Sequence, residues 1–455
     1  MLDGPILLGI FLVAIALIIF LTAKVKLHPF ISLLIAAYFI GFAVRMDVTE
    51  IATTITGGFG NILAYIGIVI ILGTIIGTIL DKSGAAVKMA ETVLRVVGRK
   101  KPALAMSIIG AIVSIPVFCD SGYVILTPLR KALTRLTNIS PVTMVVALAT
   151  GLYATHTLVP PTPGPIAAAG NLGLEGDLIL IIFLGLLVSI PALIAGYIYA
   201  VWVGKKVTTE ELSEDEVAAT YDEMISSFGK LPSATLSFAP IVVPIFLMAM
   251  GSIVKFPSYP LGEAGTFVYN TFAFLGTPVN ALFVGFLFAL ALLPKLNEET
   301  LSGWIGEGMK SAAVIIMVTG AGGALGGMLS ATPIGDYLGS TLSSLSLGIF
   351  LPFIIAAALK TAQGSSTVAL VTTSAMMAPM LSQLGFDSLM AKALVVMAIG
   401  AGAMTVSHAN DSYFWVVTEF GGLKVETAYK AQTIATLIQG LVTVTVVAIL
   451  AVFFI

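Results

Sequence analysis

Two histidine segments hold the residues of this chain that could do chemistry. The first is Thr155-His156, followed by Pro160, Pro161, Pro163 and Gly164. Proline removes a backbone donor and clashes with the preceding turn, so a helix that reaches this segment must break there. The break frees backbone carbonyls and amides beside His156, whose imidazole can exchange a proton near neutral pH.

The second segment places polar groups in an otherwise apolar tract that has no proline. It contains Ser407, His408, Asn410, Asp411 and Ser412. Ionisable groups in apolar helical tracts are costly, and they commonly mark the route of a substrate or an ion. Asp411 suits two roles equally well, because an acid can transfer a proton or cap a helix start.

Two short glycine turns supply the remaining candidates. They are Gln363-Gly364-Ser365-Ser366-Thr367 and Cys119-Asp120-Ser121-Gly122. Free amides and the positive dipole end at a helix start attract carboxylates, so the four segments together predict a site for a small anion. The predicted ligand contacts are Ser121, Thr155, His156, Gln363, Gly364, Ser365, Ser366, Thr367, Ser407, His408 and Asn410. The predicted proton-coupling residues are Asp120, His156, His408 and Asp411.

The composition places these segments in a lipid bilayer. Of the 455 residues, 58% are hydrophobic and 10% are charged, and the mean hydropathy is +1.05. Soluble domains carry about 25% charged residues, so we expect an all-α protein that crosses the membrane many times. The net charge of −2 gives no reason to expect a nucleic-acid partner.

The sequence contains no enzyme motif that would suit these residues. Neither a His-Glu-x-x-His zinc motif nor a Gly-x-Ser-x-Gly nucleophile elbow occurs. We therefore expect no catalytic residue, no metal site and no cofactor. A channel would need a continuous polar pore, whereas interrupted helices favour an occluded site, which is typical of a transporter.

The apolar runs predict how the chain crosses the membrane. Runs of spanning length lie at about 5–23, 27–45, 59–81, 141–159, 178–204, 237–254, 270–293, 311–331, 388–407 and 428–454. Two stretches with polar interruptions, 102–136 and 346–383, are expected to be re-entrant helical hairpins, with a two-helix crossing as the alternative. Broken helices are expected at about 141–170 and 388–420, and a polar cytoplasmic linker at 205–236.

Landmarks recur at a nearly constant offset. Gly77 and Gly327 lie 250 residues apart, Ser114 and Ser365 lie 251 apart, and His156 and His408 lie 252 apart. This offset predicts two repeats, 1–204 and 237–455, each with about five crossings and one hairpin. An odd number of crossings inverts the second copy, an arrangement typical of secondary transporters.

The basic residues predict the orientation, because Lys and Arg favour cytoplasmic loops. If both termini are outside, only Arg45, Lys255, Lys360 and Lys392 fall on the outer side. We therefore expect both chain ends outside and the linker inside.

The candidate segments resemble those of the gluconate permease family, within the ion transporter superfamily. The resemblance is carried by Phe118-Cys119-Asp120-Ser121-Gly122, Thr155-His156-x-x-Val159-Pro160-Pro161-x-Pro163-Gly164-Pro165, Gln363-Gly364-Ser365 and Ser407-His408-x-Asn410-Asp411-Ser412-x-Phe414-Trp415. It covers both halves of the chain. It implies proton-coupled uptake of gluconate or a related small hydroxylated monocarboxylate across the inner membrane of a bacterium.

The resemblance also implies an assembly and a transport motion. It implies a homodimer in which a transport domain moves as an elevator against a fixed scaffold. A D-serine branch of the family keeps D-serine and short hydroxy acids open as substrates. Sodium is the alternative coupling ion, because backbone carbonyls and hydroxyl oxygens at broken helices suit it as well.

Overall fold

The structure is a computed structural model that describes residues 4–98, 101–137, 139–207, 226, 228–254, 263–334, 337, 347–409 and 411–455. These residues form helices and connecting loops and contain no β-strand. The all-α fold class predicted from the composition is therefore confirmed.

The helices of the first half begin at prolines in several places, since proline at the first helical position costs no backbone bond. They are α1 (Gly4–Ile19), α2 (Pro29–Ala43), α3 (Val48–Lys82), α4 (Ala85–Val97), α5 (Pro102–Val113), α6 (Cys119–Thr137), α7 (Pro141–His156), α8 (Pro163–Asn171) and α9 (Leu178–Val203). A short π-helix, η1 (Phe20–Lys24), extends α1.

The second half of the chain is helical as well. Its α-helices are α11 (Ala234–Val254), α12 (Phe267–Leu275), α13 (Pro278–Leu290), α14 (Ile305–Ser330), α16 (Phe350–Gln363), α17 (Ser366–Met377), α18 (Leu389–Ala403), α19 (Ser412–Gly421), α20 (Val425–Ala428) and α21 (Ile434–Phe454). Short π or 3-10 turns are η2 (Glu299–Trp304), η3 (Ala378–Met380) and η4 (Tyr429–Thr433).

Fewer helices than the ten predicted crossings are long enough to span a membrane alone. Within the described ranges, five helices meet the length and hydropathy required, or up to seven if each bent pair counts as one span. The helices α7 and α18 have 16 and 15 residues, below the roughly 20 that a crossing needs. They are short because the chain breaks after His156 and after Ala403.

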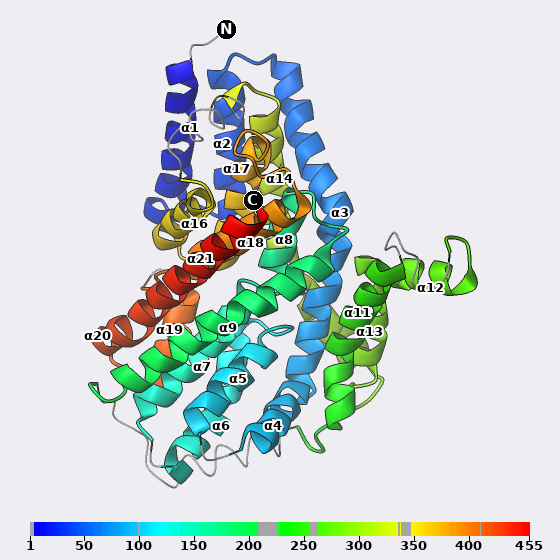
Figure 1. The fold of residues 1–455 in the computed structure, drawn as a ribbon, viewed down its shortest axis with the longest axis vertical. Helices are drawn as coiled ribbons and strands as arrows, with labels where there is room; N and C mark the ends of the chain where they lie inside the picture. Colours follow the sequence, from blue (N-terminus) through cyan, green and yellow to red (C-terminus); the bar gives the residue numbers. More distant parts are fainter. Residues whose placement is uncertain are drawn as a thin grey trace.

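The long helix α3 and helix α14 pack against each other in antiparallel directions (Figure 1). A Cβ atom added at Gly58 would lie 2.5 Å from the carbonyl oxygen of Gly323, and one at Gly308 would lie 2.8 Å from the Cα of Ile75. The N-terminal part of α3 thus packs against the C-terminal part of α14, and the C-terminal part of α3 packs against the N-terminal part of α14. Glycine permits this close backbone approach, as it commonly does between membrane helices.

The interrupted helix pairs lie at two separate places in the fold. The pair α5 and α6 lies towards one end of α3 and the pair α16 and α17 towards the other, whereas α9 and α21 run side by side between them (Figure 1). Every α7 residue from Val142 to His156 is buried, and α18 is buried over most of its length. The two histidine segments therefore begin at the ends of two core helices.

Candidate functional site

The first break lies between α7 and α8. The hydroxyl of Thr155 donates a 2.8 Å hydrogen bond to the carbonyl of Ala111 on α5, which fixes the end of α7. His156 is buried between the rings of Phe118 and Tyr153, with centroid distances of 6.1 and 6.4 Å. Its Nδ1 atom has no hydrogen-bond partner among the described residues.

The prolines after His156 redirect the chain towards the other half of the protein. The chain turns through Pro160 and Pro161, and Pro163 occupies the first turn of α8. A Cβ atom at Gly164 would lie 2.6 Å from the Leu370 side chain on α17, so glycine lets α8 approach closely. At the far end of α8, the Asn171 amide donates hydrogen bonds of 3.1 and 2.9 Å to Val371 and Ser374 of α17.

The second break lies between α18 and α19 and is held by hydroxyl groups. The backbone amide of Ser407 donates to the Thr436 hydroxyl at 2.9 Å, and the Ser407 carbonyl accepts from the Thr433 hydroxyl at 2.6 Å. Asp411 caps α19 by accepting a 3.1 Å hydrogen bond from the amide of Tyr413. The predicted contact Asn410 lies outside the described residues.

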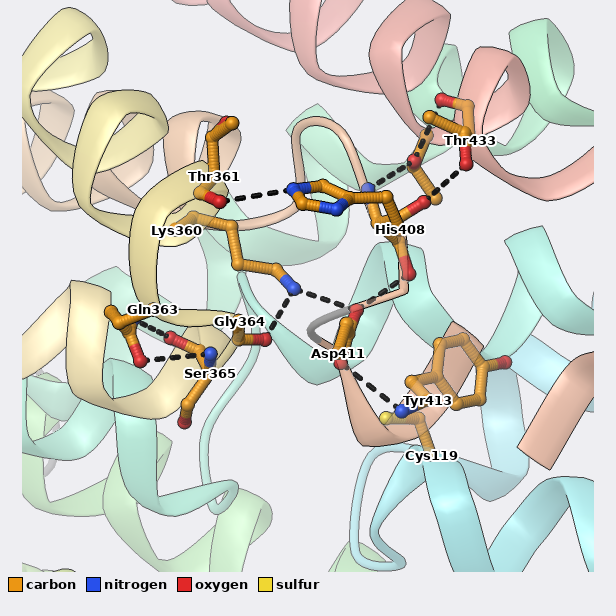
Figure 2. A network of polar contacts seen from close by, with 12 residues as sticks. Cys119, Lys360, Thr361, Gln363, Gly364, Ser365, His408, Asp411, Tyr413 and Thr433 are labelled. Carbon is orange, nitrogen blue, oxygen red and sulfur yellow. Dashed lines mark hydrogen bonds and ion pairs between the residues drawn. The ribbon is translucent and has the colours of Figure 1, made fainter. Parts of the chain in front are cut away.

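Lys360, which is not among the residues predicted for the site, joins the second break to the turn between α16 and α17. Its side chain is fully buried, and its ammonium lies 2.6 Å from Asp411 Oδ2 and 2.6 Å from the carbonyl of Gly364 (Figure 2). The Ser407 hydroxyl donates to the same Asp411 oxygen at 2.5 Å. Lys360 is therefore a buried ion-pair residue, not a loop residue that reports on orientation.

The omission of Lys360 from the predicted site has a physical cause. The orientation rule counts lysines by the side of the membrane on which they fall, without regard to burial, whereas α16 carries Lys360 to a buried acid. A usable signal was present, since Lys360 lies inside the apolar stretch 346–383 and Asp411 lies inside another apolar tract. Opposite charges at such positions commonly pair.

The turn after α16 is shaped by glycine and fixed by its neighbours. Gly364 has φ +90°, a left-handed conformation that glycine adopts without strain. The Gln363 amide donates to the Ser365 carbonyl at 2.6 Å and accepts from the Ser365 amide at 2.9 Å. The Ser365 hydroxyl caps α17 by accepting from the amide of Val368 at 3.3 Å. Ser366 is buried and Thr367 half-buried in the first turn of α17.

His408 lies apart from the Asp411 carboxylate. Its Nε2 atom is 2.9 Å from the carbonyl of Thr361, and its ring points towards α16 rather than towards Tyr413 (Figure 2). The side chain is half-buried, whereas His156 is buried. The two histidines that share a place in the predicted repeat therefore have different surroundings.

Aromatic rings connect the first break to the second. The Tyr413 ring stacks on Tyr153 at 5.0 Å, and its hydroxyl donates to the carbonyl of Ala149 at 2.8 Å. The Lys360 ammonium lies 6.0 Å from the centroid of the Tyr153 ring. The structure thus brings His156, Lys360 and Asp411 into one buried cluster that both halves build.

The first turn of α6 faces the same cluster. Cys119 is buried, Ser121 is half-buried, and Asp120 lies near Asp411 and Ser412. The Oδ1 atom of Asp120 and the hydroxyl of Tyr153 are buried without a hydrogen-bond partner among the described residues. Buried polar atoms normally find a partner, so these atoms, like His156 Nδ1, suit contact with a polar ligand.

No three His, Cys, Asp or Glu side chains gather in a metal-binding arrangement within the part of the chain that the structure describes. The buried cluster instead combines one ammonium, two carboxyl groups, an imidazole and several hydroxyls. Such groups can bind a small polar anion and exchange a proton.

Comparison with known proteins agrees with a transport site. The GntP family permease model matches residues 6–453. An uncharacterized permease of Haemophilus influenzae is 39% identical, with 90% of this chain and 85% of that protein covered. A gluconate permease of Pseudomonas aeruginosa is 31% identical, with 95% and 94% covered, and the D-serine transporter DsdX of Escherichia coli is 31% identical, with 95% of each covered.

A solved structure shows a related fold. The crystal structure of the Alcanivorax borkumensis YdaH transporter superposes with a TM-score of 0.57 at 15% identity and covers 90% of each chain. The relatives in sequence carry the names of permeases and transporters, not of enzymes. The chain is a multi-pass membrane transporter and belongs to the GntP family of permeases.

Proposed function

We propose that this transporter takes up gluconate or a related small hydroxylated monocarboxylate together with a proton. The observation that carries the proposal is the buried ammonium of Lys360 beside the turn between α16 and α17. A buried cation next to a helix start offers a carboxylate both charge and backbone donors. The names of the gluconate permeases at 28–31% identity support the same substrate class.

Hydroxyl and amide groups around Lys360 suit the rest of such a ligand. Gln363 and Ser365 lie in the turn between α16 and α17, and Ser366 is the first residue of α17. Ser407 lies at the second break, where its hydroxyl binds Asp411. These groups can exchange their present hydrogen bonds for bonds to substrate hydroxyls. Asp120, His156, His408 and Asp411 are the titratable groups available for the coupling proton.

The proposed transport motion is an elevator movement of inverted repeats. The antiparallel packing of α3 on α14, whose glycines Gly77 and Gly327 share the predicted offset, supports the inversion. The position of the two interrupted helix pairs towards opposite ends of α3 supports it as well (Figure 1). We further propose a homodimer in the inner membrane, with both termini outside.

The decisive experiment is uptake of labelled gluconate by proteoliposomes that contain the purified protein. An imposed inward proton gradient is expected to drive accumulation, and a protonophore is expected to abolish it. Liposomes without protein give the background. Uptake that follows a sodium gradient and ignores the proton gradient would replace the proton with sodium as the coupling ion.

D-serine is the second candidate substrate, because DsdX covers nearly the whole chain. Both molecules carry a carboxylate and at least one hydroxyl, which the groups around Lys360 can bind, so the residues alone do not choose between them. A competition panel of gluconate, a ketoaldonate, a short hydroxy acid and D-serine against labelled gluconate separates the candidates. Stronger inhibition by D-serine than by unlabelled gluconate, together with uptake of labelled D-serine, would identify D-serine as the preferred substrate.

A further inference from the structure

We propose that the Lys360–Asp411 ion pair is the coupling device, in which the substrate carboxylate replaces Asp411 on the Lys360 ammonium once Asp411 has taken up a proton. This inference rests on the proposed carboxylate symport and deepens it. In this scheme the proton binds Asp411 and the substrate carboxylate binds Lys360. The full burial of the Lys360 side chain and the 2.6 Å contact carry the argument.

The hydrogen bonds around Asp411 allow this exchange. Oδ2 accepts from Lys360 and from the Ser407 hydroxyl, and Oδ1 accepts from the Tyr413 amide. A protonated Asp411 keeps one acceptor oxygen for Tyr413 and can share its other oxygen with Ser407. Only the ammonium of Lys360 loses its counter-ion, so protonation frees Lys360 without removing the cap of α19.

The freed ammonium faces groups that suit a carboxylate. It still donates to the Gly364 carbonyl, which places it at the turn that Gln363 and Ser365 shape (Figure 2). The unpartnered atoms of Asp120, Tyr153 and His156 lie in the same buried cluster. A hydroxylated carboxylate could therefore bind Lys360 through its charge and these groups through its hydroxyls.

The need to keep the buried site electrically neutral then explains why substrate and proton are coupled. Without substrate, the pair is neutral, because the ammonium and the carboxylate compensate each other. Substrate alone leaves one negative charge in excess, and a proton alone leaves one positive charge in excess. A buried uncompensated charge is costly, so the site can cross the membrane when it is empty or when it holds both substrate and proton. On the inside the proton leaves Asp411, which pairs with Lys360 again and displaces the substrate.

Other titratable groups face Asp411 from the neighbouring helices. They are Cys119 and Asp120 from α6 and Tyr153 and His156 from α7. From η4 and α21, the hydroxyls of Thr433 and Thr436 form hydrogen bonds with the backbone of Ser407, in the segment that precedes Asp411. Among the described residues, Lys360 is the one cation in direct ion-pair contact with Asp411.

The experiment compares gluconate binding to wild type, Asp411→Asn, Asp120→Asn and the double variant Lys360→Met/Asp411→Asn over a series of pH values. The double variant replaces both charges, so it keeps the buried site neutral and remains testable where Lys360→Met alone would leave an unpaired carboxylate. Glu307→Gln is the matched control, because Glu307 forms a 2.5 Å ion pair with Lys82 between α14 and α3, away from the site.

We expect the wild-type affinity for gluconate to fall by up to about tenfold per pH unit as the pH rises, as one linked proton requires. Asp411→Asn is expected to remove this slope and, in proteoliposomes, to lose proton-driven accumulation. The double variant is expected to bind gluconate about 10- to 100-fold more weakly than Asp411→Asn, because it lacks the charge-assisted bond. Glu307→Gln is expected to keep the wild-type slope.

Three results would overturn the inference while leaving proton-driven gluconate uptake by the wild type intact. They are a pH slope that survives in Asp411→Asn, a slope lost in Asp120→Asn but not in Asp411→Asn, and wild-type affinity in the double variant. If the wild type takes up no carboxylate of the panel, the proposed function fails first, and the inference fails with it.

Discussion

The hydroxyl of Ser365 shows how one residue at this site combines a structural contact with a place beside the charged centre. It caps α17 through Val368 and lies next to Gly364, whose carbonyl binds Lys360. Its backbone is held on both sides by Gln363. A change at Ser365 therefore removes a helix cap and a candidate ligand contact together, and the two effects must be separated.

We expect Ser365→Ala to lower gluconate uptake at least tenfold while the free energy of unfolding falls by only about 1 kcal/mol, the usual cost of a lost N-cap. Ser388→Ala is the matched control, because Ser388 caps α18 through a 3.1 Å bond from the Ala391 amide and lies outside the cluster. Uptake and thermal unfolding of both variants are measured. Equal loss of uptake in the two variants would assign Ser365 a capping role alone.

At the scale of elements, the antiparallel contact of α3 and α14 depends on the absence of side chains. A Cβ atom at Gly323 would lie 2.6 Å from the Gly58 carbonyl and would also collide with the Ile62 side chain. The neighbouring Gly57 on α3 and Gly306 on α14 have no atom within 4 Å of such a Cβ. The same two helices thus carry both crowded and open glycine positions.

We expect Gly323→Ala to destabilise the protein by about 1–3 kcal/mol, the usual cost of overpacking. Gly57→Ala and Gly306→Ala are expected to leave stability unchanged or slightly raised, because alanine favours the helix and meets no neighbour. Thermal unfolding in detergent compares the three variants. A Gly323→Ala protein as stable as the wild type would show that the two helices can separate without cost.

At the scale of the whole molecule, the proposed orientation puts Lys205 and Lys295 on the cytoplasmic side and Glu263 on the outer side. All three side chains are exposed in the structure. The natural Cys119 is 2% exposed, so it gives a low background for thiol labelling. Single cysteines at these positions can therefore report on the sides of the membrane.

We expect a membrane-impermeant maleimide to label Glu263→Cys in intact cells and to label Lys205→Cys and Lys295→Cys only after permeabilisation. The wild-type chain with Cys119 alone is the control and should remain unlabelled. Labelling of Lys205→Cys in intact cells would reverse the orientation. Labelling of Lys205→Cys and Lys295→Cys from different sides would contradict the two crossings predicted between them, 237–254 and 270–293.

The sequence predicts the fold class well and the site unevenly, for reasons visible at particular residues. The break after His156 follows from the prolines at 160, 161 and 163, whose effect on a helix is local. The break after Ala403 has no such local cause, because Thr433 and Thr436, distant in sequence, hold its backbone. Lys360 was missed since its partner Asp411 is 51 residues away, and pairing over such a distance depends on the packing of α16.

The sharing of the aromatic stack between the halves has a consequence for assembly. Tyr153 and Ala149 come from the first half, whereas Tyr413, Lys360 and Asp411 come from the second. Neither fragment of a split gene could complete the proposed binding site, even if each inserted correctly into the bilayer. If transport is restored when the two halves are produced as separate polypeptides, the halves must have associated and formed the contact between Tyr153 and Tyr413.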